Sequence, residues 1–234
     1  MMMGRRRAAW PRKDGDTIMK TTIFAGALAL LTATPALAAD DQLEWWSDLT
    51  LSHDLDKKTF VEFQTQQRFR ESPAGDSHIY RIWLGRKISK ATSLSLGLHR
   101  SKEGADLETR IIEQASYTLD SKLGLKGRTR LEQRMIDGRD RTGWRLRQRI
   151  GVAIPLTDKP KDWALAANAE GFFTLRATSA TGDTGLTGLR TFVGFQKTFG
   201  KMDLGVGYTR QQSIRKNRPD VVGHAPTLNL TFKL

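Results

Sequence analysis

The chain has 234 residues, a length that fits one domain or two small ones. It contains no cysteine, which excludes a disulfide framework, thiol chemistry and zinc sites built on thiolates. Apolar residues make up only 38% of the chain, and the formal charge of +13 would by itself indicate an anionic partner such as nucleic acid.

Residues 1–39 precede the patterned part of the chain. Met19 and Lys20 lead into a short apolar run, Ile23–Leu31, and the small residues of Ala36-Leu37-Ala38 follow a break. A cationic start, a short apolar centre and small residues at a cut are typical of a secretory signal peptide. The run is too short for a membrane helix, which needs about 20 apolar residues. We therefore predict an N-terminal extension with a cleaved signal peptide over 1–39, and export argues against a nucleic-acid partner.

From residue 42 onward, apolar and polar side chains alternate with a period of two. In a strand this places the apolar side chains on one face and the polar ones on the other. Each patterned segment has roughly ten residues, the length that crosses a bilayer as a tilted strand. The segments span 42–54, 59–70, 78–88, 92–101, 108–119, 122–135, 144–154, 163–176, 188–199, 202–212 and 227–234.

Longer and shorter connections alternate along these segments. The longer ones lie at 70–77, 101–107, 136–142, 177–187 and 213–224, and the tight ones at 89–92, 120–122 and 200–201. Outer-membrane barrels combine long external loops with short periplasmic turns. We therefore predict an all-β fold, a closed antiparallel up-and-down transmembrane barrel over 40–234. Such barrels usually have even strand numbers, so one segment would not span or one is hidden, and we predict 10–12 strands.

The segments 122–135 and 144–154 carry the densest charge, on the face opposite their apolar residues. In a barrel this charged face would line the lumen. The predicted lumen charge network consists of Glu62, Arg81, Glu108, Arg110, Lys126, Arg128, Arg130, Glu132, Arg134, Arg145, Arg147, Arg149, Glu170 and Arg190. Interleaved arginines and carboxylates would either fill a lumen of this size or line a narrow pore that prefers anions.

Three polar residues, Glu113, Gln133 and Gln148, break the alternation on the apolar face of consecutive segments. A β-bulge at the Ile111-Ile112 pair would reset the register, and this is the explanation we favour. The alternative is an outward patch that contacts another protein.

The run Arg130-Leu-Glu132-Gln-Arg134, followed by Trp144-Arg-Leu-Arg-Gln-Arg149-Ile-Gly-Val-Ala-Ile-Pro155, resembles a domain-of-unknown-function family of bacterial outer-membrane β-barrel proteins. The resemblance extends from Trp45 to Leu234. It implies a secreted barrel of about this length, and it implies no activity.

An enzymatic alternative starts from His99-Arg-Ser101, where histidine and serine lie two residues apart on one strand face. This His-x-Ser core is similar to that of the lipid A deacylases of the outer membrane. With Glu108 it would make a hydrolase triad, although the following Lys102-Glu103 departs from that pattern.

The remaining histidines and the tryptophans give no further catalytic signal. His53, His78 and His224 lack metal-ligand spacing, so we expect no metal and no other cofactor. Tryptophans lie near several segment starts, as an interfacial aromatic belt requires. They are Trp45, Trp46, Trp144 and Trp163.

These patterns together predict an outer-membrane protein that is not an enzyme and is either structural or a narrow anion-preferring pore. Its expected partners are outer-membrane lipids, a small anionic solute and, during biogenesis, the barrel-assembly machinery. Two alternatives stay open: a lipid A or phospholipid hydrolase that uses His99 and Ser101, and a periplasmic lipid-binding barrel.

Overall fold

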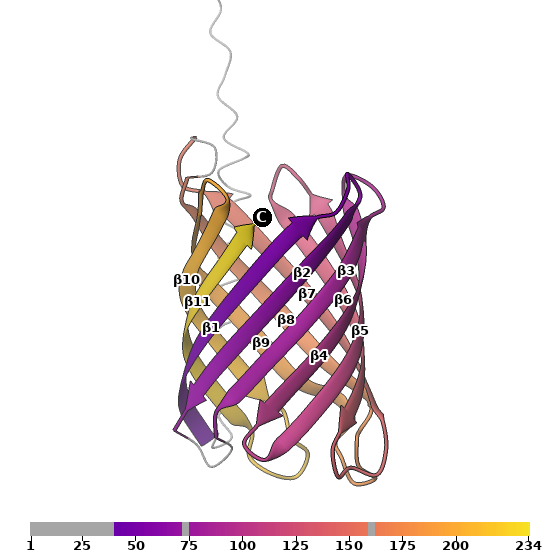
Figure 1. The fold of residues 1–234 in the computed structure, drawn as a ribbon. Coiled ribbons are helices and arrows are strands. Elements are labelled where there is room, and N and C mark those ends of the chain that lie inside the picture. The colour runs from indigo at the N-terminus through magenta and orange to yellow at the C-terminus, as the bar shows by residue number, and fades with distance from the viewer. Residues whose placement is uncertain (1–39, 72–74, 159–161) are drawn as a thin grey trace, which may run out of the picture. The chain divides into compact units, whose positions relative to one another are not determined.

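The computed structural model describes residues 40–71, 75–158 and 162–234, and in them eleven strands close into one barrel (Figure 1). The strands are β1 (Asp40–Asp54), β2 (Thr59–Arg70), β3 (Ser77–Lys87), β4 (Thr92–Glu103), β5 (Asp106–Asp120), β6 (Leu125–Ile136), β7 (Gly143–Pro155), β8 (Ala164–Arg176), β9 (Gly185–Phe199), β10 (Met202–Ser213) and β11 (Val221–Lys233). Each predicted segment corresponds to one strand, which confirms the all-β closed barrel. The predicted signal peptide lies outside the described residues. No helix in the described part has the length and apolar character to cross a membrane.

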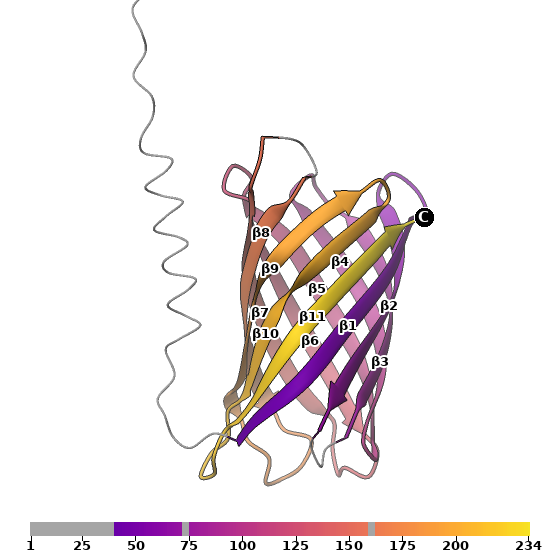
Figure 2. The same cartoon turned by 90° about the vertical axis from the view of Figure 1, so that its left-hand side faces the viewer.

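Consecutive strands pair antiparallel in an up-and-down order, and the closing pair of β1 with β11 is parallel. Asp40 lies opposite Val221 and Ser52 opposite Lys233. Figure 2 shows the two strands side by side with their arrows in the same direction. An odd number of strands requires one such parallel pair, so no segment needed to be removed or added to close the barrel. The pattern of alternation did not predict this parallel seam.

The last strand begins at Val221, six residues before the expected start at Thr227. Pro226 lies inside this strand, opposite Tyr208 of β10. On the other side the pairing with β1 is interrupted beside Pro226, between the partners of His224 and Thr227. A proline nitrogen has no hydrogen to donate to the backbone hydrogen bonds between strands. The presence of Pro226 in the sequence therefore suggests that the last strand starts later than it does in the structure.

One connection is much shorter than predicted. The loop expected over 101–107 is a tight turn of Gly104 and Ala105 between β4 and β5. Gly104 has φ of 56°, a left-handed conformation that glycine adopts without a steric penalty. Because of this glycine, the strands on either side extend further than their side-chain pattern indicates.

The outward faces of the strands expose large apolar side chains all around the barrel. They include Tyr80, Ile82, Leu84, Leu94, Leu96, Leu98, Ile111, Ile150, Phe173, Leu175, Phe195 and Val206. Leu84, for example, is 56% exposed. Soluble proteins rarely present so much contiguous apolar surface to water.

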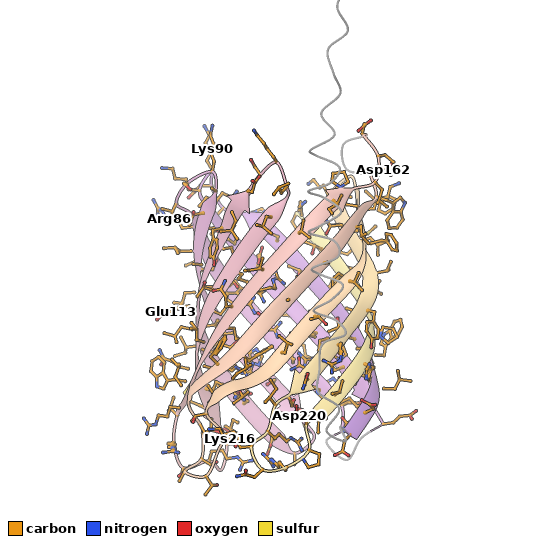
Figure 3. The ribbon with its side chains drawn as sticks, turned by 180° about the vertical axis from the view of Figure 1, so that it is seen from behind. Arg86, Lys90, Glu113, Asp162, Lys216 and Asp220 are labelled. Atoms are coloured by element: carbon orange, nitrogen blue, oxygen red, sulfur yellow. The ribbon has the colours of Figure 1, made fainter. Side chains whose placement is uncertain are left out.

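The predicted bulge at Ile111-Ile112 is wrong. The register of β5 with β6 is continuous there, with Ile111 opposite Gln133 and Glu113 opposite Leu131. Ile112 is buried inside the barrel, whereas Glu113 points outward from the wall (Figure 3). The alternation is therefore kept, and the polar residues on this outward face are real exceptions to its apolar character.

Gln148 forms a hydrogen-bonded group with two outward residues of the neighbouring strands. Thr129 Oγ1 donates to Gln148 Oε1 at 2.6 Å, Gln148 Nε2 donates to the Tyr117 hydroxyl at 2.8 Å, and that hydroxyl lies 3.2 Å from Thr129 Oγ1. Polar groups that satisfy one another in this way are less costly on an apolar surface. The role of the outward patch in contacting a protein stays a prediction.

Large apolar side chains also point into the barrel. Trp46, Trp83, Ile112 and Phe172 are each less than 5% exposed. The expected interfacial position of Trp46 is wrong, because it shares the inward parity of Glu44 and Asp48 on β1. Its neighbour Trp45 faces outward and is 47% exposed.

Gly207 on β10 and Gly194 on β9 are directly opposed. A Cβ on Gly207 would lie 2.4 Å from the Val193 carbonyl oxygen and 2.7 Å from the Gly194 Cα, both backbone atoms. We expect Gly207→Ala to destabilise the barrel by about 1–3 kcal/mol because the backbone must shift. Urea unfolding followed by tryptophan fluorescence measures this. Gly205→Ala is the matched control, since its Cβ would be 3.4 Å from the Asn229 Cβ, and equal effects of the two would contradict the prediction.

Asp162, in the connection before β8, accepts hydrogen bonds from Lys197 Nζ and Thr157 Oγ1, both at 2.9 Å. The bond from Lys197, with smaller contributions from the Trp163 amide and Thr157, lowers the pKa of Asp162 to about 2. This contribution to stability is present above the ordinary pKa of 3.8 and is lost as pH falls through about 2. We expect Lys197→Met to raise the pKa of Asp162 toward 3.8, as measured by NMR titration of its carboxyl carbon. An unchanged titration would show that Lys197 is not the cause.

Candidate functional site: the charged lumen

The inward faces of β5 to β9 carry a continuous network of ion pairs. Most of the predicted lumen residues join it: Glu108, Arg110, Arg128, Glu132, Arg134, Arg145, Arg147, Glu170 and Arg190. They come from β5, β6, β7, β8 and β9. Strand alternation puts their side chains on the inward face of each strand, and the curvature of the barrel brings the side chains of different strands close to one another.

Glu132 of β6 is the most enclosed acid of the network. Its Oε2 accepts from Arg145 Nε at 2.8 Å and Nη2 at 2.5 Å, and its Oε1 accepts from Arg147 Nη1 at 2.9 Å. Arg110 lies 3.8 Å away on the other side. Glu132 and Arg145 are direct cross-strand partners, so the register itself forms this pair.

Glu170 of β8 repeats the arrangement. Arg147 Nη2 and Arg128 Nη2 each donate to it at 2.6 Å, and Arg190 Nη1 lies 3.9 Å away. Arg147 therefore joins the two carboxylates of Glu132 and Glu170 with opposite ends of one guanidinium group. A planar fork of N–H donors suits this bridging role, which a lysine could not fill in the same way.

Glu108 of β5 forms a third, peripheral cluster. It accepts from Arg134 Nε at 2.6 Å and from Arg110. Arg110 in turn links this cluster to Glu132. The network is thus one connected system and not a set of isolated pairs.

Two of the three acids of the network are more enclosed than most of its arginines, and the third, Glu108, is 10% exposed. The Glu132 side chain is 0% exposed and that of Glu170 is 2% exposed. In contrast, Arg190 and Arg134 keep 18% and 21% of their side-chain surface accessible. The bridging Arg147 is an exception, since it is as deeply buried as the acids. The accessible surface of the network therefore belongs mainly to arginine side chains, and Glu132 and Glu170 contribute almost none of it.

Two of the predicted residues lie in the lumen without joining an ion pair among the described residues, and they interact with neutral groups. Arg81 donates to Gln64 Oε1 at 2.9 Å and to His99 Nδ1 at 3.0 Å. Arg130 donates to Gln114 Oε1 at 2.5 Å and lies over the Trp83 ring, 4.8 Å from its centroid. Such contacts satisfy hydrogen bonds and add cation–π attraction, but they do not neutralise charge.

Three predicted residues stay at the edge of the network. Glu62 accepts a long hydrogen bond of 3.4 Å from Ser52, Lys126 is exposed, and Arg149 lies opposite Arg128. In the described part of the chain, no ion pair includes any of the three. Sequence reasoning did not single out the inward residues Arg68, Asp48 and Gln66, or the inward rings of Trp46, Trp83 and Phe172. Their inward parity is visible in the alternation, but they lie outside the dense run of arginines at 122–154 that indicates the network.

The His99–Ser101 pair lies on the inward face of β4. His99 is 0% exposed, and its Nδ1 accepts a hydrogen bond from Arg81. Ser101 is buried as well, and Glu108, the third member of the predicted triad, is bound by Arg110 and Arg134. No hydrogen bond links His99 with Ser101 among the residues that the structure describes. Nor do these residues contain a group of histidines and acids placed to hold a metal ion.

The network allows a direct test of stability. Glu132→Gln removes the charge that compensates three arginines in an enclosed site, and we expect it to destabilise the barrel by about 3–5 kcal/mol. Urea unfolding in detergent measures the change. Asp137→Asn is the matched control, because it removes an exposed pair with Arg100 whose contribution is about 1 kcal/mol or less.

A second variant separates charge balance from general damage. Glu132→Gln combined with Arg145→Gln removes one charge of each sign, so we expect part of the lost stability to return. If the double variant is as unstable as the sum of the two single variants, the network does not act through charge balance.

Three comparisons with known proteins place the chain. The model of the family "Protein of unknown function (DUF2490)" matches residues 43–222. An uncharacterized protein of Methylorubrum extorquens strain AM1 is 29% identical over 229 residues, which cover 91% of this chain and 98% of that protein. Among solved structures, LpxR from Salmonella typhimurium is similar with a TM-score of 0.48 and 14% identity, covering 86% of this chain and 92% of that one. A chain from a structure titled for the in-meso crystallization of membrane proteins has a TM-score of 0.42 and 13% identity, covering 76% and 77%.

Proposed function

We propose that this chain, which belongs to the DUF2490 family of proteins of unknown function, is an outer-membrane barrel that forms a narrow, anion-preferring passage. The observation that supports this proposal most is the asymmetry of the lumen network, in which arginine side chains keep accessible surface while the carboxylates of Glu132 and Glu170 are enclosed. It has no enzymatic activity in this proposal.

Membrane insertion follows from the outer surface of the barrel. Closed barrels satisfy all backbone hydrogen bonds between strands, and an outward apolar band faces the acyl chains. The exposed leucine, isoleucine and phenylalanine side chains fit that role, and an interior of arginine and glutamate does not suit a lipid tail. A periplasmic lipid-binding barrel would have the opposite distribution, with an apolar interior and a polar exterior.

Anion preference follows from which charges a solute would meet. A chloride or a small oxyanion in the lumen would contact Arg190 or Arg134, whereas a cation would find Glu132 and Glu170 covered. Rings of positive side chains in a narrow pore favour anions for this reason. Arg81 and Arg130, which have no carboxylate partner among the described residues, add to the positive potential.

The passage is narrow because side chains fill the barrel near its middle. Trp46, Trp83 and Phe172 are almost fully buried there, together with Glu132 and Glu170. Arg147 packs against the Phe172 ring, 4.4 Å from its centroid. This packing also supports a second candidate function, in which the network closes the barrel and its role is structural.

The hydrolase alternative has less support from the geometry. His99 and Ser101 face the lumen, so a lipid in the membrane would have to pass through the barrel wall to reach them. Lipid hydrolase activity in the unmodified protein that is absent from Ser101→Ala would nevertheless overturn the proposal of a non-enzymatic barrel.

Planar-bilayer recording tests the passage. In a KCl gradient, we expect small conductance steps with a reversal potential that indicates chloride preference. Replacing Arg134 and Arg190 together by glutamine should move the reversal potential toward zero, because these arginines present the most accessible charge in the network.

The matched control is Arg100→Gln, since Arg100 pairs with Asp137 among exposed side chains. Its selectivity should equal that of the unmodified protein. No conductance in either gradient direction would exclude the passage and leave the structural role. Cation preference would contradict the reasoning from exposed arginines.

A further inference from the structure

We infer that the lumen contains a discrete binding site for a phosphate-class oxyanion, formed by Arg68 and Arg190 over the Trp46 ring and by Arg81, which shares Gln66 with Arg68. This inference rests on the proposed anion-preferring lumen and names the ligand class and the residues of one site within it.

Arg68 of β2 and Arg81 of β3 converge on a single neutral acceptor. Arg68 Nη2 donates to Gln66 Oε1 at 3.0 Å, and Arg81 Nη2 lies 3.3 Å from the same oxygen. Two positive groups thus share an amide oxygen where a carboxylate would be expected. Among the described residues, no ion pair joins either arginine to an acid.

Arg190 brings a third positive charge to the same place. The Trp46 ring lies under both Arg68 and Arg190, whose guanidinium carbons are 4.0 Å and 4.9 Å from its centroid. Arg190 reaches Glu170 only at 3.9 Å and donates its Nε–H to Gln211. Stacking on an aromatic ring holds a guanidinium group in position and leaves its edge free for a ligand.

Acids lie near these three cations, but among the described residues only Arg190 has one within ion-pair distance, Glu170 at 3.9 Å. Glu44 instead accepts from the Trp46 indole N–H and pairs with Arg70. Asp48 of β1 accepts a hydrogen bond from Gln66 Nε2 at 2.7 Å, so the amide separates it from the two arginines that bind the other end of Gln66. Among the described residues, Arg68 and Arg81 therefore have no carboxylate in direct contact. The contrast is the neighbouring cluster, where Glu132 and Glu170 contact Arg145 and Arg147 directly.

His99 supplies an unused donor beside Arg81. An arginine N–H can only donate, so the Nδ1 that accepts from Arg81 Nε carries no proton. The neutral ring then bears its proton on Nε2. That atom is buried and has no partner in the part of the chain described, and the same is true of Arg68 Nε. A buried donor without an acceptor is unfavourable, and an oxyanion is the acceptor that would also supply the missing charge.

The ligand class follows from these donors. Guanidinium groups bind the oxygens of phosphate through parallel N–H···O bonds, and a doubly charged oxyanion offsets the surplus of positive charge better than chloride does. Apart from the Trp46 ring, the described side chains named at this site are polar or charged, so the source is a soluble phosphate or a hydrophilic phosphomonoester and not a membrane lipid.

Titration calorimetry tests the site with inorganic phosphate and protein extracted from outer membranes in detergent. We expect phosphate to bind the unmodified protein at least tenfold more tightly than chloride. Arg68→Gln and Arg81→Gln should each weaken phosphate binding by tenfold or more, while Arg100→Gln leaves it unchanged. Equal binding of phosphate and chloride, or no loss in either lumen variant, would overturn the inference.

Two further measurements distinguish a soluble phosphate from a lipid phosphate, and the binding site from the proposed passage. Glycerol phosphate should compete at least as well as long-chain phosphatidic acid in the same micelles, and competition by the lipid alone would refute a solute site. The comparison of anions uses only the unmodified protein, so it stands even if a variant fails to fold. Anion-selective conductance without phosphate affinity would refute this site and keep the proposed passage, and phosphate affinity without conductance would do the reverse.

Discussion

Charge that is enclosed in a barrel can be compensated only by side chains that reach it across the lumen. Arg147 shows how this chain meets the constraint, because its guanidinium group binds Glu132 at one end and Glu170 at the other. Taking two charges out of water is unfavourable, and the attraction between them offsets that loss only with good geometry and further hydrogen bonds. The register of β6, β7 and β8 provides that geometry, so the strand alignment and the charge network depend on each other.

The lumen contains fewer acids than arginines, and the acids are unevenly distributed among the strands. Glu132 and Glu170 lie where β6, β7 and β8 meet, and Arg70 of β2 pairs with Glu44 and Glu103. Among the described residues, Arg68 of β2 and Arg81 of β3 contact amides, an aromatic ring and a neutral histidine instead. A lumen with this composition is neither a neutral plug nor a uniform positive ring. On one side each carboxylate is shared by several arginines, and on the other side Arg68 and Arg81 have no acid in direct contact among the described residues. We propose that the first side contributes stability and that the second binds a ligand.

Much of the fold follows from the period-two alternation, and its limits have physical causes. Alternation identified all eleven strands and the faces of Glu132, Arg147 and Glu170, since a side chain's face depends only on parity. It could not show that β1 and β11 close in parallel, because closure depends on how many strands fit around the wall. Gly104 was hidden in a polar stretch that reads equally well as a loop. Ile112 and Glu113 were misassigned because a lone carboxylate facing outward is rare enough that a bulge was the simpler explanation. Which arginine binds which acid was also beyond the sequence, since long side chains reach diagonally across strands.

The parallel seam has a topological consequence for engineering this barrel. With an odd number of strands, the first residue of β1 and the last residue of β11 belong to opposite rims of the wall (Figure 1). A peptide joining Leu234 to Asp40 would have to run the full height of the barrel. Its path would lie either through the interior, which side chains fill near the middle, or along the apolar outer surface. Circular permutation with a short linker works where the first and last strands end at the same rim, and we expect it to fail here. Reporter groups fused next to Asp40 and Leu234 would likewise lie on opposite sides of the membrane that the barrel spans.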